Sequence, residues 1–417
     1  MCAYSGSSVV VDATAEVIFG EEPALGTLPI TLPGVYPYGS GVRYPKVSLR
    51  RGDPTEAGFT ARAFARVDGV ITTAIRDSAF PGAQLVVARN GIIVHRKSYG
   101  MHTYNPYSPL IDDSTLFDLA SLTKVTATTN AVMRLVDEGM IKLEEPVVRY
   151  LPQFGQKGKE RITVLNLMIH NSGLPAWRKF YEFCATPECV MDSIYAMEPT
   201  YRAGDSTVYS DLGFITLGKI IERVTGTPLD RYVDSVFFRP LGMRRTMFNP
   251  PSWRRTAIAP AEVDNYWKKT NRPVQGRVHD ENAAVLGGVS GHAGLFSTAS
   301  DLAVIMQMLL NGGSYGGTRY IQEETVSRFT RQVSSTSSRA IGWDTRSMGR
   351  SISGKHASPQ TYLHTGFTGT SIVCDPEKNL IIIFLTNRVY PSRAQSKIFD
   401  IRPRVHDAIY EALGGGN

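Results

Sequence analysis

Apolar and polar positions along the chain change their period several times, and each change predicts a different element. Apolar side chains recur at helical spacing over about 60–78, which predicts an amphipathic helix. Two strand-like runs follow, at 83–88 and 92–99, joined by Asn90-Gly91. This pair tolerates positive φ at both positions and is typical of a tight hairpin, so an antiparallel sheet begins here.

The rest of the chain is first helical and then returns to strands. Helical stretches at 124–138 and 212–224 dominate the middle, where strand-like runs are few. A second hairpin, formed by 370–373 and 380–386, is followed by a final helix at 398–412. The pattern predicts an α/β fold: an antiparallel sheet built from both ends of the chain and flanked by helices, with an inserted mainly helical domain.

The predicted domain organisation separates an extension from the main body. Residues 1–50 are rich in Gly and Pro, with no sustained helical or strand period, so we expect an N-terminal extension. The body spans 51–417. Its α/β part covers about 51–125 and 290–417, and its helical part about 126–289.

Composition and charge exclude several classes of protein. The 417 residues are 42% hydrophobic and 20% charged, which is typical of a globular chain and not of a disordered one. The net charge of +7 comes without a nucleic-acid-binding motif, so we expect no nucleic acid partner. The longest apolar run, Leu380–Leu385, cannot span a bilayer, and the N-terminus lacks a signal-peptide pattern. We therefore expect no membrane association and a cytoplasmic location.

The four cysteines are too few and too irregularly spaced for a disulfide framework. Reduced thiols are expected, although Cys184 and Cys189 could close a small loop under oxidising conditions. Neither has the partner His or second Cys pair that a zinc site requires. We expect no metal and no cofactor.

The first candidate for chemistry is Ser121-Leu122-Thr123-Lys124, where a strand-like approach gives way to a helix. Residues three apart on a first helical turn face the same way, so Ser121 and Lys124 can meet. A Ser hydroxyl is a weak nucleophile that needs an adjacent base, and a desolvated Lys can be neutral enough to serve. A helix cap with a surface Lys would leave the same pattern, so the pair needs support from elsewhere.

Two further motifs supply that support: Tyr209-Ser210-Asp211 and His364-Thr365-Gly366. In this order the three motifs resemble those of the serine β-lactamase and penicillin-binding-protein family, Ser-x-x-Lys, Tyr-x-Asn and Lys-Thr-Gly. The Tyr of the second motif resembles the class C β-lactamase and esterase branch. The fold that the resemblance implies agrees with the one predicted above.

The resemblance also implies roles for individual residues. Ser121 would be the acylated nucleophile and Lys124 its activating partner. Tyr209 would be the general base, with a pKa lowered by the positive charge of Lys124. The backbone N–H groups of Ser121 and Phe367 would form the oxyanion hole.

Two positions depart from the β-lactamase pattern, and both belong to the expected substrate-binding residues along with Thr365 and Gly366. Asp211 stands where the pattern has Asn, so a group that can donate is replaced by one that only accepts when ionised. His364 stands where β-lactamases have Lys, which weakens the fixed positive charge that would hold a β-lactam carboxylate. We therefore expect poor hydrolysis of β-lactams.

A glycine-rich segment, Gly276–Phe296, resembles a narrower branch. This branch comprises bacterial exo-acting N-acetylmuramyl-L-alanine amidases and the β-lactamase-like halves of β-N-acetylglucosaminidase fusions. Its His279 and His292 are further candidates for substrate binding, whereas His170, in a family segment, is expected to be structural. Residues 15–30 of the extension resemble the tail of a family-three glycoside hydrolase, which precedes the hydrolase domain in such fusions.

The sequence thus predicts a serine hydrolase that forms an acyl-enzyme and cleaves an amide in muramyl-peptide-like or other small or peptide-like substrates. A carboxylesterase of the same family is an alternative, and a catalytically silent ligand sensor is another. An α/β-hydrolase lipase is disfavoured because the chain has no Gly-x-Ser-x-Gly motif.

Overall fold

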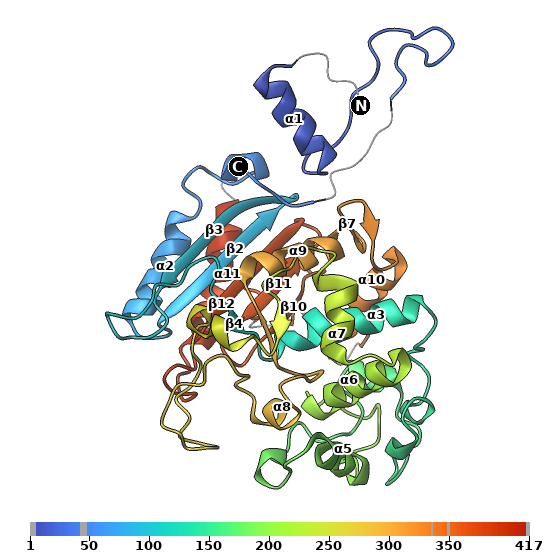
Figure 1. Ribbon diagram of the computed structural model, residues 1–417, viewed down its shortest axis with the longest axis vertical. Helices are drawn as coiled ribbons and strands as arrows, with labels where there is room; N and C mark the ends of the chain where they lie inside the picture. The colour runs from blue at the N-terminus through green and yellow to red at the C-terminus, as the bar shows by residue number, and fades with distance from the viewer. Residues whose placement is uncertain (1–5, 42–47, 335–336, 348–350, 414–417) are drawn as a thin grey trace.

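The computed structural model describes residues 6–41, 48–334, 337–347 and 351–413. Within them, seven strands form the main sheet, in the order β1-β3-β2-β12-β11-β10-β9 (Figure 1). Their bounds are β1 (Arg50–Arg51), β2 (Gly82–Arg89), β3 (Ile92–Gly100), β9 (Asp344–Thr345), β10 (Tyr362–Thr365), β11 (Ser371–Asp375) and β12 (Leu380–Thr386).

Both predicted hairpins form, and they lie side by side in one sheet, so segments from the two halves of the chain are paired there. Asn90 and Gly91 turn between β2 and β3 with φ of 53° and 73°, the conformation that this pair tolerates. Strand β12 then pairs antiparallel with β2 along its whole length. The predicted sheet is confirmed, and only the short edge strand β1 runs parallel to its neighbour.

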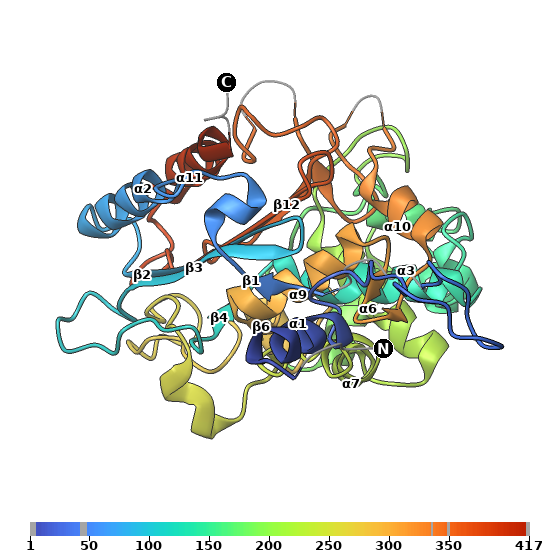
Figure 2. The same ribbon diagram turned by 90° about the horizontal axis from the view of Figure 1, so that it is seen from above.

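Alternating side chains of the strands bury both faces of the sheet. One face packs against α2 (Ala65–Arg76) and α11 (Ile398–Leu413), and the other packs against α9 (Ala299–Leu310) and the helical layer (Figure 2). In β2, for example, Leu85 and Val87 point to the first core while Val86 and Ala88 point to the second.

The helical layer and its small sheets lie beyond α9. Its α-helices are α3 (Asn130–Asp137), α4 (Val164–Met168), α5 (Pro187–Ala196), α6 (Asp211–Thr225), α7 (Leu229–Val233), α8 (Glu281–Val285) and α10 (Glu323–Thr330). The short strands are β4 (Phe117–Asp118), β5 (Met247–Phe248), β6 (Leu295–Ser297), β7 (Ser314–Tyr315) and β8 (Thr318–Arg319). Short 3₁₀ helices are η1 (Pro54–Ala57), η3 (Val147–Arg149), η4 (Pro152–Phe154), η5 (Phe180–Glu182) and η7 (Ser252–Ala257), and η6 (Asp234–Phe238) is a short π-helix.

The predicted helix at 124–138 is interrupted near its start. Its first part, η2 (Lys124–Thr129), is wound more widely, as a π-helix, before α3 continues. The Asn130 amide donates to the carbonyls of Val125 and Thr126, at 3.0 and 3.1 Å, and so stabilises the wider turns. Such π segments are frequent at functional sites.

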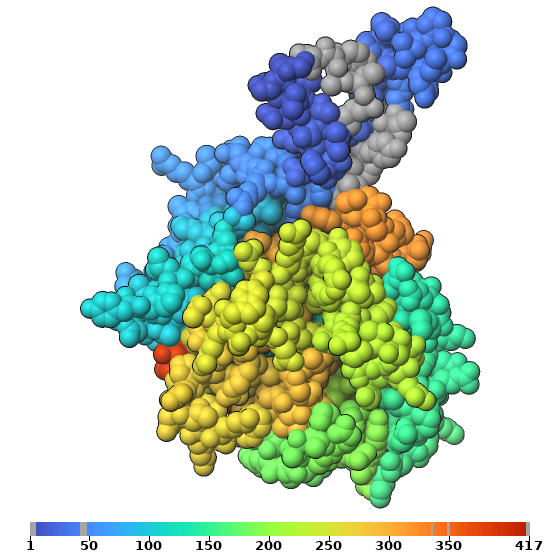
Figure 3. All heavy atoms as spheres, viewed as in Figure 1, coloured from blue at the N-terminus to red at the C-terminus, as the bar shows by residue number. Residues whose placement is uncertain are grey.

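The extension contains a helix that the sequence pattern did not predict. Helix α1 (Ser8–Ile18) buries none of its residues. Figure 3 shows the extension projecting from the body. Ser48, just before β1, donates its N–H and Oγ to the carbonyls of Gly20 and Phe19, at 3.1 and 2.9 Å, and so connects the earlier part of the extension to the segment that enters the sheet.

The expectation of reduced thiols was wrong for one pair. Cys184 and Cys189 form a disulfide with a Cα–Cα distance of 5.4 Å, between η5 and α5. The turn that leads into α5 brings the two cysteines together, which their spacing alone left open. Cys374 is a free, buried thiol.

Candidate active site

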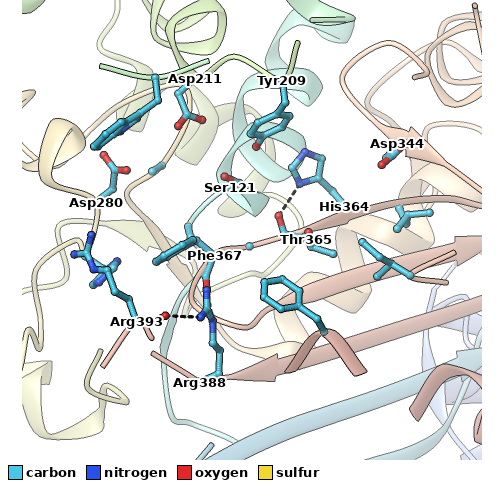
Figure 4. A pocket seen from close by; sticks show the side chains of 18 of the residues that line it. Ser121, Tyr209, Asp211, Asp280, Asp344, His364, Thr365, Phe367, Arg388 and Arg393 are labelled. Carbon is cyan, nitrogen blue, oxygen red and sulfur yellow. Dashed lines mark hydrogen bonds between the residues drawn. The ribbon is translucent and has the colours of Figure 1, made fainter. Parts of the chain in front are cut away.

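The candidate nucleophile sits in the turn between β4 and η2. Ala120, directly before Ser121, has a φ of 45°, which is rare for a residue with a side chain. The Ala120 N–H donates to the Asp118 carboxylate at 2.8 Å, which closes the turn. Ser121 thereby lines a cleft with a volume of about 590 Å³ (Figure 4).

Lys124 is fully buried beneath this turn, and its ammonium group has three acceptors. It donates to Ser121 Oγ at 3.0 Å, to Asp211 Oδ1 at 2.6 Å and to the His292 carbonyl at 3.1 Å. Burial lowers the pKa of Lys124, but the Asp211 carboxylate and Tyr209 raise it by more. The net pKa lies above its ordinary value, which favours a protonated Lys124 that activates Ser121 through its charge over a neutral Lys124 that acts as the base.

Tyr209 lies directly before α6, with its ring beside two cations. Lys124 Nζ is 4.9 Å from the ring centroid, and the Arg339 guanidinium is 5.3 Å from it. On another side the ring packs against His170 at 4.5 Å, and His170 Nδ1 accepts the Ser210 N–H at 3.0 Å. The buried His170 thus holds the second motif in place, in agreement with its expected structural role.

His364, at the end of β10, carries no positive charge. Burial lowers the pKa of His364 well below its ordinary value, and the charges of Lys124 and Arg339 add to this effect. Its Nδ1 donates to the Thr365 carbonyl at 3.0 Å, so in the neutral form the proton lies on Nδ1. In the described part of the chain its Nε2 is buried without a partner, and its ring lies 6.0 Å from that of Tyr209.

The turn that follows β10 lies against the nucleophile turn. A side chain at Gly366 would meet Thr370 Oγ1 at 2.1 Å and the Leu119 carbonyl at 2.3 Å, so only Gly permits this approach. The buried Arg402 donates to the carbonyls of Gly366 and Thr370, at 2.9 and 3.0 Å. Phe367, the next residue, is 49% exposed and faces the cleft.

His279 and His292, both candidates for substrate binding, have different surroundings. His279 lines the cleft, stacks on Phe367 at 5.8 Å and bonds to Glu262 Oε2 at 3.0 Å. Burial raises the pKa of Glu262, but hydrogen bonds from His279 and Arg393 lower it to about 2.

His292 is 1% exposed, and both of its ring nitrogens are bonded, to Ser290 Oγ at 2.8 Å and to Asp280 Oδ1 at 3.0 Å. The His292 ring has no surface in the cleft. Its carbonyl, rather than its ring, reaches the site, through Lys124.

The cleft brings the expected residues together and adds others that the motifs did not indicate. Ser121, Tyr209, Asp211, His279 and the His364–Phe367 segment all line it. The additional charged and aromatic residues are Trp177, Asp280, Glu281, Arg339, Asp344, Arg388, Arg393, Phe399 and Arg402. No motif marks Arg339 or Trp177. Asp280 and Glu281 lie in the glycine-rich segment that drew attention to His279.

Among the described residues, no group of three or more His, Cys, Asp or Glu side chains is arranged to hold a metal ion. In the same residues, no helix is long and apolar enough to cross a membrane.

Comparison with known proteins identifies the family. The Beta-lactamase family model matches residues 67–403, which is most of the chain. The chain belongs to the Beta-lactamase family. A Salmonella agona protein named "Putative D-alanyl-D-alanine carboxypeptidase" is 35% identical over 391 residues, covering 86% of this chain and 89% of the relative. This Beta-lactamase family member is thus a serine hydrolase.

Solved structures of the family share the fold. A class C β-lactamase superimposes with a TM-score of 0.68 at 20% identity, covering 84% of this chain and 98% of its own. EstCE1, a hydrolase with promiscuous acyltransferase activity, gives a TM-score of 0.67 at 22% identity, with 84% and 98% covered. The expected β-lactamase and penicillin-binding-protein-like fold is confirmed at this level.

Proposed function

We propose that this family member hydrolyses an amide through an acyl-enzyme on Ser121. Ser121 Oγ attacks the carbonyl carbon, and its proton passes to Tyr209 and then to the leaving nitrogen. Lys124 and Arg339 place positive charge beside Tyr209, which is what a phenolate base requires. Water then attacks the acyl-enzyme and releases the acid.

The oxyanion would be held by the backbone N–H groups of Ser121 and Phe367. In the described part of the chain, neither N–H donates to another backbone carbonyl, and both residues line the cleft. Two preorganised donors in a protected cleft stabilise the charge that develops in the transition state. The hydrogen bonds that fix the two turns keep these donors in place.

A muramyl amide fits this cleft better than a β-lactam. The neutral His364 offers no fixed cation to a β-lactam carboxylate, and the Asp211 carboxylate is engaged by Lys124. The observation that carries the proposal is the position of the glycine-rich segment, which resembles the muramyl amidase branch. It supplies Asp280 and Glu281 to the cleft and the carbonyl of His292 to Lys124.

The lining of the cleft offers groups that suit both halves of such a substrate. Trp177, which is 40% exposed, lines the cleft together with Asp280 and Glu281. An aromatic face and carboxylate acceptors suit the carbon face and hydroxyl groups of a sugar. Arg339 lies beside Tyr209 and can pair with the carboxylate of a leaving amino acid.

A side-by-side assay tests this proposal. Hydrolysis of N-acetylmuramyl-L-alanine, a D-alanyl-D-alanine peptide, nitrocefin and p-nitrophenyl acetate should favour the muramyl amide. Ser121→Ala should lower every measurable rate at least ~10³-fold while the fold survives, and a fluorophosphonate should add its mass to Ser121 only. A folded Ser121→Ala protein that retains a tenth of the activity would overturn the nucleophile. Preference for the D-alanyl peptide would overturn the muramyl substrate.

A carboxylesterase is a second candidate, favoured by one feature of the cleft. Phe367 and Phe399 are 49% and 58% exposed on its wall, with the Arg388 guanidinium 4.5 and 5.7 Å from their rings. This apolar shelf suits the alkyl part of an ester. If p-nitrophenyl butyrate, added to the same assay, is turned over faster than both the acetate and every amide, this candidate is supported.

A further inference from the structure

A buried carboxylate behind the nucleophile connects three segments of the site. Asp118 is 5% exposed, and each of its carboxylate oxygens accepts a backbone N–H: Oδ1 from Ala120 at 2.8 Å and Oδ2 from His279 at 2.7 Å. Burying a carboxylate costs free energy unless hydrogen bonds compensate for the lost water, as the two N–H donors do here. The pKa of Asp118 is raised because it is buried, and the two N–H donors oppose that rise.

The backbone around Asp118 reaches the third segment. The Asp118 carbonyl accepts the Thr368 hydroxyl at 2.7 Å, and the Leu119 carbonyl accepts the Thr370 hydroxyl at 3.0 Å. These bonds tie the strand before Ser121 to the turn that carries Phe367. The turns that present the two proposed oxyanion donors are therefore held by the same two residues, Asp118 at the end of β4 and Leu119 directly after it.

We propose that Asp118 is a positioning residue that sets the direction of the Ser121 hydroxyl and N–H for acylation. Its bond to Ala120 holds that residue at a φ of 45°, which an Ala adopts only when its surroundings impose it. Without the bond Ala120 relaxes toward negative φ and rotates the peptide that ends in the Ser121 N–H. The bond to His279 keeps the cleft wall in register with the same turn. This inference rests on Ser121 as the nucleophile.

Asp118→Asn tests the proposal because it keeps the size of the side chain and turns one acceptor into a donor. We expect acylation of Ser121 by a fluorophosphonate to slow by roughly 10²-fold, as for a small misplacement of a reacting group. The number of sites finally labelled should not change. A purely structural role would instead lower the number of competent sites and leave the rate per site unaltered.

A second substitution provides rescue. Gly adopts positive φ without help. The double variant Asp118→Asn with Ala120→Gly should therefore acylate faster than Asp118→Asn alone and should reverse at least a third of the decrease in the logarithm of the acylation rate. Asp112→Asn is the matched control: Asp112 accepts the Ser114 N–H at 2.8 Å in a similar turn, but is exposed and outside the cleft lining. It should acylate at the wild-type rate.

The outcomes separate the two hypotheses. If the wild-type protein forms no adduct on Ser121, the proposed nucleophile is overturned. If the adduct forms normally and Asp118→Asn acylates at the wild-type rate, the positioning role is overturned. If Asp118→Asn does not fold, Asp118→Ser and Asp118→Ala replace it. Ser can accept from Ala120 and Ala cannot, so Ser should acylate at least ~3-fold faster. Equal rates would contradict the proposal.

Discussion

At the scale of single residues, the charge on Lys124 governs what its neighbours can do. A neutral Lys124 could remove the proton from Ser121 directly, but Asp211 keeps the amine protonated. A protonated Lys124 acts through its field and its hydrogen bond to Ser121 Oγ, and the base must be another group. Tyr209, whose ring centroid lies 4.9 Å from the ammonium, is that group in our proposal.

The dependence of Tyr209 on Lys124 predicts a non-additive pair of substitutions. Lys124→Ala and Tyr209→Phe should each slow acylation roughly 10²–10⁴-fold, the range for a positioned acid or base. The double variant should lose far less than the product of these losses, because removing the charge already disables the phenol. Acylation rates of all four proteins, measured with one fluorophosphonate, decide the point. Strictly multiplicative losses would mean that the two residues act independently.

Asp211 and His364 predict a change of substrate. Asp211→Asn with His364→Lys should raise acylation by nitrocefin, because an amide donor and a fixed cation then face the β-lactam. Turnover of N-acetylmuramyl-L-alanine should fall at least ~10-fold, since Lys124 loses its carboxylate partner. Steady-state kinetics on both substrates, for the single and double variants, provide the test. Efficient nitrocefin hydrolysis by the wild type would show that these positions do not select the substrate.

At the scale of elements, we propose that the residues before Ser48 form a unit separate from the body. Its polar links run through Ser48 and through an ion pair between Arg50 and Glu22. Arg50 also pairs with Glu56 of the body, at 2.6 Å, so it keeps a partner without the extension. Partly exposed ion pairs contribute little to stability.

Deleting residues 1–47 should therefore leave the body intact. We expect the free energy of unfolding to change by less than about 1 kcal/mol and the acylation rate of Ser121 to stay at the wild-type value. Denaturant titration and fluorophosphonate labelling measure the two quantities. Deletion of residues 1–52 is the contrasting variant, since it also removes β1 and its pairing with β3, and it should destabilise the body further. Similar stability losses for the two deletions would contradict this division.

At the scale of the whole molecule, buried histidines make stability depend on pH. Burial lowers the pKa of His170 and His364 well below the ordinary value, and that of His406 to about 4. Below about pH 6.5 the unfolded chain binds protons at these sites and the folded protein does not. Keeping these histidines neutral in the folded protein therefore costs little free energy above pH 6.5, and the free energy of unfolding falls as the pH drops toward 4.

His406 allows a direct measurement of this effect. Between pH 8 and pH 5 it should cost about 2 kcal/mol of unfolding free energy, by the linkage of a depressed pKa. His406→Gln should reduce the pH dependence by that amount. Guanidinium titrations at both pH values give the numbers. An equal pH dependence in wild type and His406→Gln would show that His406 is protonated in the folded state.

The sequence by itself determined the elements whose causes are local. The hairpin at Asn90 and Gly91, the apolar strands and the terminal helices follow from turn chemistry and from periods of two and 3.6. The contact between Ser121 and Lys124 is local as well, because one helical turn joins them. The three motifs, in their order, resemble those of a serine hydrolase family, and this resemblance indicated the function; the structure then brings residues of all three to one cleft.

Only the tertiary structure decided the charge states and the partners. Lys124 and Asp211 are 87 residues apart, and the 2.6 Å contact that keeps Lys124 charged depends on how α6 packs. The neutral His364, the cation of Arg339 beside Tyr209 and the Cys184–Cys189 pair have the same origin. A pKa depends on burial and on charges a few ångströms away in space, and spacing along the chain does not contain those distances.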